Sequence, residues 1–147
     1  MDSLIVPWSL SMSEDEQKYK SMGFIKTKGT VYQEPPSVED LVSAFRQQCN
    51  ALSPLTVGAR ALAKHVVYPR LGSDEDKNIL ADTFLTNFIS TATWKNIHRI
   101  NAQHIIYEIR DDSGFGFRWY VDDPLNIVFR GAIEPYATYL DFKARLT

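Results

Sequence analysis

The chain has only one cysteine, Cys49, among its 147 residues. A single cysteine cannot form an internal disulfide, so nothing in the sequence points to an oxidising compartment. Long apolar runs are absent too, and no stretch approaches the roughly 20 residues that a membrane span needs. The first residues have neither the basic region nor the apolar core of a secretory signal. We therefore expect a cytoplasmic or nuclear protein with no membrane association.

The sequence also lacks an excess of basic charge. Its 16 Lys and Arg residues face 18 Asp and Glu residues, which gives a net charge of -2. This balance disfavours a general nucleic-acid or membrane-surface binder, although it leaves room for a local basic patch.

Motifs for catalysis, metal binding and nucleotide binding are absent as well. There is no phosphate-binding glycine loop and no nucleophile motif, and the three histidines have no cysteine or carboxylate partners at metal-ligand spacing. Cys49 falls on an apolar helical pattern, where cysteine usually fills space in the core. The sequence therefore predicts no catalytic residue, no metal and no cofactor.

What the sequence does contain is the pattern of one globular α+β domain. A hydrophobic content of 44% and a charged content of 23% are ordinary for such a domain. Three capped helices are predicted: one over about 38–52 after Ser37, one from Ser53 to about Val67, and one from Ser73 to about Ile97. Residues 1–21 are expected to form a variable N-terminal arm with the option of flexibility, and residues 22–147 the single domain.

After the third helix the apolar period changes from 3.6 to 2. Alternation over about 103–110, 115–121 and 126–134 predicts three strands. Their short links indicate antiparallel neighbours. The predicted fold is three helices followed by a three-stranded antiparallel meander that packs on them.

The segment SGFGFRWYV, residues 113–121, resembles half of the RNA-binding signature of the RRM fold. That signature turns its Gly-flanking aromatics outward to stack on bases. Here it would turn Arg118 into the core, which is costly for an unpaired guanidinium. The opposite facing buries four side chains instead: Phe115, Phe117, Trp119 and Val121. We predict this core strand, with RNA binding through GFGFRWY as the less favoured alternative.

The polar face of the meander carries candidate ligand-binding residues. A turn near residue 113 places Glu108 roughly opposite Arg118, and the next turn places Arg118 near Arg130. Two arginines side by side repel unless an anion lies between them. That anion is either Glu108 or Glu134, in a salt-bridged row on a solvated sheet, or the phosphate or carboxylate of a ligand.

The second predicted helix adds Arg60, Lys64 and His65. Arg60 and Lys64 are four residues apart and share a helical face, and His65 is one step round. The simple interpretation is a solvated helix face with a half-buried histidine. The sharper hypothesis turns all three toward Arg118 and Arg130, which makes an anion pocket between the helix and the sheet.

Three segments in order, LTVGARALAKH, GFGFRW and FRGAIEP, resemble an uncharacterised family of eukaryotic proteins. The resemblance covers about residues 55–135. Members of that family continue with a tail that contains Gly-His and Trp, whereas this chain continues with YATYLDFKARLT. The resemblance implies no activity.

Two functions are consistent with these patterns. The first is a protein-interaction domain without catalysis, acting as an adaptor or complex subunit of unknown oligomeric state. Its support is two apolar segments outside the predicted core, LIVPW and YATYLDF, with five candidate partner-binding residues: Leu4, Val6, Trp8, Tyr136 and Tyr139. The alternative is an enzyme or ligand-binding domain for an anionic substrate. The sequence favours the first and predicts a protein partner.

Overall fold

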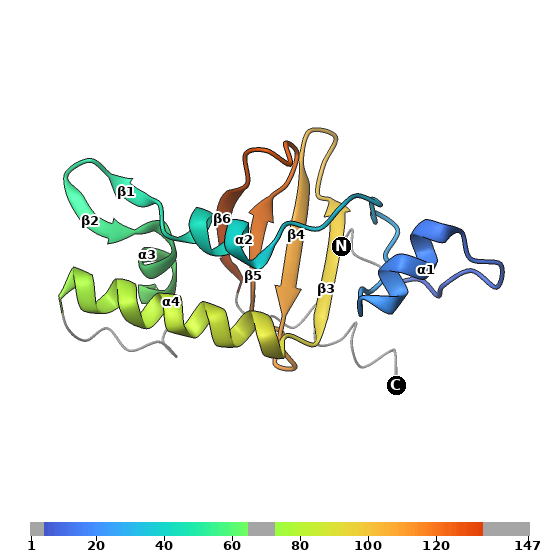
Figure 1. Cartoon of the computed structure of the whole chain (residues 1–147), viewed down its shortest axis with the longest axis horizontal. Helices are drawn as coiled ribbons and strands as arrows, with labels where there is room; N and C mark the ends of the chain where they lie inside the picture. Colours follow the sequence, from blue (N-terminus) through green and yellow to red (C-terminus); the bar gives the residue numbers. More distant parts are fainter. Residues whose placement is uncertain (1–4, 65–72, 134–147) are drawn as a thin grey trace.

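A computed structural model describes residues 5–64 and 73–133 of the chain (Figure 1). Over these residues the fold is α+β, as the sequence predicts, but with more elements. The helices are α1 (Glu14–Ser21), α2 (Val38–Phe45), α3 (Val57–Ala63) and α4 (Asp74–Thr91). The strands are β1 (Gln48–Asn50), β2 (Ser53–Thr56), β3 (Trp94–Arg99), β4 (Ile105–Arg110), β5 (Gly116–Tyr120) and β6 (Val128–Ile133).

The main sheet is antiparallel and has four strands in the order β3-β4-β5-β6. The predicted meander is its last three strands. The prediction that the long helix continues to about Ile97 was wrong, because α4 ends at Thr91 and the next segment is β3. Thr91, Thr93 and Trp94 have β-branched or aromatic side chains that favour extended backbone. Six consecutive residue pairs with β4 then outweigh any continuation of the helix.

The segment between α2 and α3 was also predicted wrongly. Cys49 and Leu52 continue the apolar spacing of α2, yet the helix ends at Phe45 and a β1–β2 hairpin follows. Leu52 lies at the hairpin tip and is 97% exposed, so it does not pack in the core with Phe45 as its helical spacing predicted. Ser53 begins β2, and Thr56 caps α3 by accepting the N–H of Ala59.

Two of the predicted helix starts are confirmed. Ser37 Oγ accepts the N–H of Asp40 at 3.1 Å, and Ser73 Oγ accepts the N–H of Asp76 at 3.2 Å. Asp76 also accepts the N–H of Ser73, which completes a capping box. These caps fix where α2 and α4 begin along the sheet.

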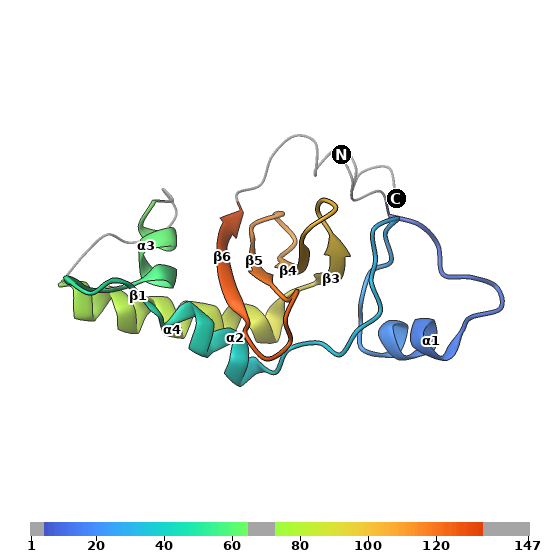
Figure 2. The ribbon, with the colours of Figure 1, turned by 90° about the horizontal axis from the view of Figure 1, so that it is seen from above.

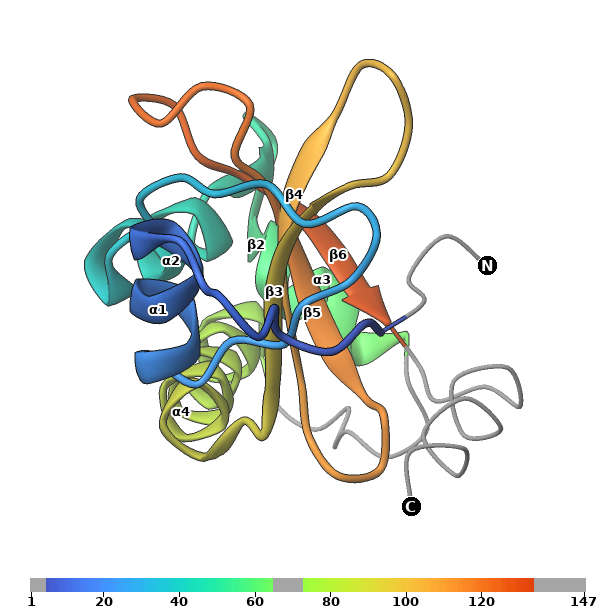
Figure 3. The ribbon, with the colours of Figure 1, turned by 90° about the vertical axis from the view of Figure 1, so that its right-hand side faces the viewer.

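Helices α2 and α4 pack on one face of the sheet (Figure 3). The predicted inward facing of Phe115, Phe117, Trp119 and Val121 is confirmed, since none is more than 6% exposed. Phe117 meets Phe45 of α2 and Phe88 of α4 edge-on. The indole of Trp119 donates to the carbonyl of Leu41, 3.1 Å away. Because the rings of Phe115, Phe117 and Trp119 are buried, they are not available to stack on bases.

Residues 5–33 run beside the β3 edge of the sheet, the edge opposite β6 (Figure 2). Ile25 N–H donates to Lys95 O, and Val31 N–H donates to Ile97 O, so residues 25–31 lie along the edge of β3. Tyr19 of α1 is only 2% exposed and donates to Val31 O. Among the residues described, no helix is long and apolar enough to cross a membrane.

Candidate functional site

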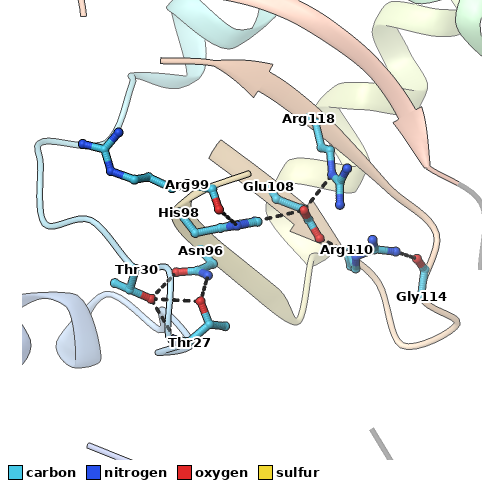
Figure 4. A network of polar contacts seen from close by, with 9 residues as sticks. All are labelled: Thr27, Thr30, Asn96, His98, Arg99, Glu108, Arg110, Gly114 and Arg118. Carbon is cyan, nitrogen blue, oxygen red and sulfur yellow. Dashed lines mark hydrogen bonds and ion pairs between the residues drawn. The ribbon is translucent and has the colours of Figure 1, made fainter. Parts of the chain in front are cut away.

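The basic residues singled out from the sequence fall into two separate places. Arg118 joins Glu108, His98 and Arg110 in a buried group on the sheet, which we call the Glu108 cluster (Figure 4). Arg60, Lys64 and Arg130 line a surface pocket between α3 and β6, which we call the α3–β6 pocket. Both sites contain arginines, but in the first they are paired with a carboxylate of the protein, and in the second they line an open pocket.

In the Glu108 cluster one carboxylate meets three nitrogen-bearing side chains. Arg110 Nε donates to Glu108 Oε2 at 2.6 Å, and Arg118 Nε donates to Oε1 at 2.7 Å. His98 Nε2 lies 3.1 Å from the same Oε1. Strand pairing brings these side chains together. Glu108 of β4 is directly opposite Arg118 of β5, as predicted. On its other side Glu108 is opposite Asn96 of β3, and His98 lies two residues further along β3 on the same face.

The Glu108 cluster is shielded from water. Glu108, Arg110 and His98 are each 2% exposed, and the side chain of Arg118 is 19% exposed. The prediction of a solvated row on this face was therefore wrong at its centre. Alternation in the sequence identifies which residues share a face, but it does not reveal that charges on that face neutralise one another and can be buried together.

The electrostatics of the cluster favour an ionised Glu108. Burial acts to raise the pKa of this carboxyl group, but the hydrogen bond from His98 and the positive charges of Arg118 and Arg110 outweigh it and lower the pKa to about 2. Glu108 is thus the fixed anion of the cluster at neutral pH. The carboxylate that the arginines of this face require is supplied by the protein itself.

Space for the buried guanidinium of Arg110 comes from the glycines of GFGFRW. A Cβ at Gly116 would lie 2.0 Å from Ile109 O and 2.8 Å from Arg110 Cγ. Gly114 O accepts a hydrogen bond from Arg110 Nη1. The motif that resembles an RNA-binding signature therefore makes room for a structural arginine.

A second polar group ties the cluster to the N-terminal segment (Figure 4). Asn96 is fully buried and donates to Thr27 Oγ1 at 2.9 Å, while Thr30 Oγ1 donates to Asn96 Oδ1 at 3.0 Å. Thr30 also bridges His98 through the backbone. These bonds hold residues 27–30 against β3 beside the cluster.

The α3–β6 pocket is open and has a volume of about 460 Å³. Among the described residues, its basic lining is Arg60, Lys64 and Arg130, its apolar lining is Val57, Ala61, Phe129 and Ala132, and Cys49 and Gly131 also line it. No ion pair involves Arg60, Lys64 or Arg130 within the described ranges. Three cations that no described carboxylate neutralises create a positive potential around the pocket, which attracts an anion.

Local sequence explains why α3 lies so near the sheet. A Cβ at Gly58 would come within 2.3 Å of the ring of Phe45, so only glycine permits this approach of α3 to α2. Phe45 in turn meets Phe129 of β6 edge-on at 5.0 Å between centroids. The aromatic contact sets β6 against the helix pair and so forms the wall of the pocket.

A β-bulge directs Arg130. Arg118 pairs with Gly131 and Trp119 pairs with Phe129, so Arg130 is the extra residue in β6. Gly131 has φ +154°, a conformation that favours glycine. The sequence predicted that Arg118 lies near Arg130 on the adjacent strand, and the structure pairs Arg118 with the next residue, Gly131. The guanidinium of Arg130 lies 5.9 Å from the ring centroid of Tyr120, and its Nε donates to Tyr120 OH at 3.3 Å.

The candidates of the sequence thus divide as follows. Arg60, Lys64 and Arg130 come together, whereas Glu108 and Arg118 belong to the other site. His65 and Glu134 lie outside the described residues. The sequence did not place His98 or Cys49 in these sites, because His98 lies on β3 and Cys49 on β1, and both segments were predicted as helix.

The partner-binding candidates are placed only in part. Val6 is half-buried and its N–H donates to Lys26 O at 2.9 Å. Trp8 is half-buried against the hydrophobic core. Leu4, Tyr136 and Tyr139 lie outside the described residues. No group of three potential metal ligands occurs in the part of the chain that the structure describes.

No family model matches the sequence, and no curated protein or solved structure is similar enough to the chain to count as a match. The geometry of the two sites is therefore the basis for any statement about function.

Proposed function

We propose that this chain is a ligand-binding domain that recognises an anionic group, a phosphate or a carboxylate, in the α3–β6 pocket. The observation that carries the proposal is the convergence of Arg60, Lys64 and Arg130 on one open pocket, with no acidic partner among the described residues. Guanidinium groups suit both anions, because their planar N–H donors match two oxygens at once.

The Glu108 cluster supports this assignment by contrast. Where the fold needs Arg110 and Arg118 for structure, it supplies Glu108 within 2.7 Å of both. In the α3–β6 pocket the corresponding acid is not supplied by any described residue. An external anion there would relieve the repulsion among three positive side chains. A protein-interaction role stays a prediction of the sequence, because the described residues add no observation in its favour.

Inorganic phosphate is the simplest probe, with binding measured by calorimetry. Cys49, the only cysteine, lines the pocket, so the rate of its alkylation by iodoacetamide reports whether the bound anion lies there. We expect phosphate to bind and to slow alkylation. Arg60→Ala should weaken phosphate binding by about 10- to 100-fold, the usual value of one hydrogen bond to a charged group.

Arg99→Ala is the matched control. Arg99 is an exposed arginine on β3, at the far edge of the sheet from β6. This variant removes the same charge and should leave both phosphate binding and Cys49 protection unchanged. If neither inorganic phosphate nor an organic phosphate or carboxylate binds in a way that protects Cys49, the proposal is refuted.

A further inference from the structure

The lining of the α3–β6 pocket combines positive side chains with apolar ones, and this mixture supports a statement about the ligand that rests on the proposed function. Val57, Ala61 and Lys64 follow one another at helical spacing and share one face of α3. Val57 and Ala61 make this face apolar, Lys64 at the C-cap adds a positive charge at its end, and Arg60 adds a second one beside Ala61. Seven residues separate its ends, or about 10 Å along the helix axis.

The opposite wall repeats this mixture of apolar and positive side chains. Phe129 and Ala132 of β6 present apolar surface, and Arg130 lies between them in sequence. The ring of Phe129 is held edge-on by Phe45 and Trp119, so its position is fixed by the core. A fixed apolar wall contributes to binding without the entropy cost of ordering a mobile side chain.

The positive side is also restrained. Arg130 donates to Tyr120 OH and lies over its ring, which limits the directions its guanidinium takes. Arg60 lies on α3, and Lys64 is the C-cap residue one helical turn later. Three cations match a dianion better than a single carboxylate, and a phosphate monoester is close to a dianion at neutral pH because its second pKa is about 6.

Open space exists above the backbone between these groups. A Cβ at Gly131 would meet no atom of the described residues within 4 Å beyond its chain neighbours, so these residues leave room for a ligand atom over this position. The volume of about 460 Å³ exceeds what a bare phosphate ion fills and lies within the usual range of about 300–1,000 Å³ for small-molecule sites.

We infer that the α3–β6 pocket takes a phosphate monoester whose organic part carries an apolar group next to the phosphate. The phosphate lies among Arg60, Lys64 and Arg130, and the apolar group lies against Val57, Ala61 and Phe129. A soluble aryl or alkyl phosphate and the headgroup of phosphatidic acid share this chemistry.

Three soluble probes test the two halves of the inference: phenyl phosphate, inorganic phosphate and benzoate. We expect phenyl phosphate to bind at least about tenfold more tightly than inorganic phosphate, the gain from partly burying one ring. It should also bind more tightly than benzoate, which has the ring but one charge. All three affinities are measured on the full chain by calorimetry, with protection of Cys49 as the measure of location.

Two variants separate the contributions. Val57→Thr keeps the side-chain volume but makes it polar, so it should weaken phenyl phosphate several-fold and leave inorganic phosphate unchanged. Arg60→Ala should weaken both phosphates in parallel. Arg99→Ala, the control at the other edge of the sheet, should change neither.

The outcomes are distinct. Equal affinity for phenyl phosphate and inorganic phosphate would overturn the inference that the ligand has an apolar group. Equal affinity for benzoate and phenyl phosphate would overturn the inference that the site prefers a dianion. The proposed anion site survives either result. If none of the three binds at Cys49, the proposed function itself fails. Vesicles with and without phosphatidic acid then identify the source: capture only by the acidic vesicles indicates a lipid, and no capture indicates a soluble phosphate.

Discussion

The Glu108 cluster and the α3–β6 pocket each gather two arginines and a third basic or imidazole side chain, and they differ in one respect. The cluster contains its own anion, and the pocket, in the described part of the chain, does not. Glu108 at the centre of the cluster is only 2% exposed, whereas the pocket is open to solvent. An arginine on a sheet is therefore no indication of function by itself; whether the protein supplies its counter-charge is the more informative property.

The largest expected effect is that of Glu108→Gln. Removing the carboxylate leaves Arg110 buried without its counter-charge, and breaking a buried ion pair from one side typically costs about 3–5 kcal/mol. Urea unfolding measures the loss. Glu34→Gln is the control, since Glu34 pairs with Lys18 at 2.8 Å but its side chain is 78% exposed, and exposed pairs contribute about 0–1 kcal/mol. Equal effects of the two changes would remove the distinction between a closed and an open site.

Acid should weaken the same interaction gradually. The pKa of Glu108 in the folded chain is about 2, below the ordinary value of 4.5, so its ionised form stabilises the fold above pH 4.5. This stabilisation should be lost as the pH falls from about 4.5 to about 2. The difference in unfolding free energy between the wild-type chain and Glu108→Gln should shrink over that window. A difference that stays constant down to pH 2 would contradict the lowered pKa.

Arg118→Ala should have an intermediate effect. Its hydrogen bond to Glu108 is 2.7 Å long and partly shielded, and such a bond to a charged group contributes about 1.5–3 kcal/mol. Arg110 and His98 remain beside the carboxylate, so the cluster should not collapse entirely. The midpoint of thermal unfolding should fall clearly, while the far-UV circular dichroism spectrum of the folded state stays the same. An unchanged midpoint would mean that Arg118 contributes no more to stability than an exposed arginine does.

Arg130→Ala should have the smallest effect on folding. Arg130 is exposed and has no ion pair with a described residue, so its removal should change stability by no more than about 0.5 kcal/mol. Its effect should appear in binding, as a weaker affinity for phosphate. Arg118→Ala is the matched change on the neighbouring strand and should show the reverse pattern. A large loss of stability in Arg130→Ala would mean that the pocket arginine is structural as well.

Sequence patterns were sufficient for features set by local rules. The caps Ser37 and Ser73 and the period-2 alternation of β4, β5 and β6 are confirmed, because hydrogen-bonding geometry and side-chain alternation act over a few residues. The alignment of Glu108 with Arg118 followed from a short turn alone. The grouping of Arg60 with Lys64 followed from their helical spacing.

The features that were missed depend on contacts between distant segments. Strand β3 has buried residues on both faces, with Ile97 on one and Asn96 and His98 on the other, so it shows no alternation of apolar and polar residues. Without β3 the sequence could not reveal that Glu108 has a third partner, or that its face is buried. The bulge at Arg130 adds one residue to a ladder, and no local pattern marks it.

The attachment of residues 27–30 to β3 also affects when this segment can dock during synthesis. Thr30 bridges His98, and Asn96 bonds both Thr27 and Thr30, so a segment that is synthesised before β3 depends on β3 for its contacts. At about 5–20 residues per second, several seconds pass on the ribosome before β3 follows. During that interval Thr27 and Thr30 have no Asn96 to bond, and α1 has no sheet beside it. Residues 27–30 therefore cannot dock before β3 has been synthesised. Because this contact also closes a long loop, we expect the docking of residues 27–30 on β3 to be a late step in folding.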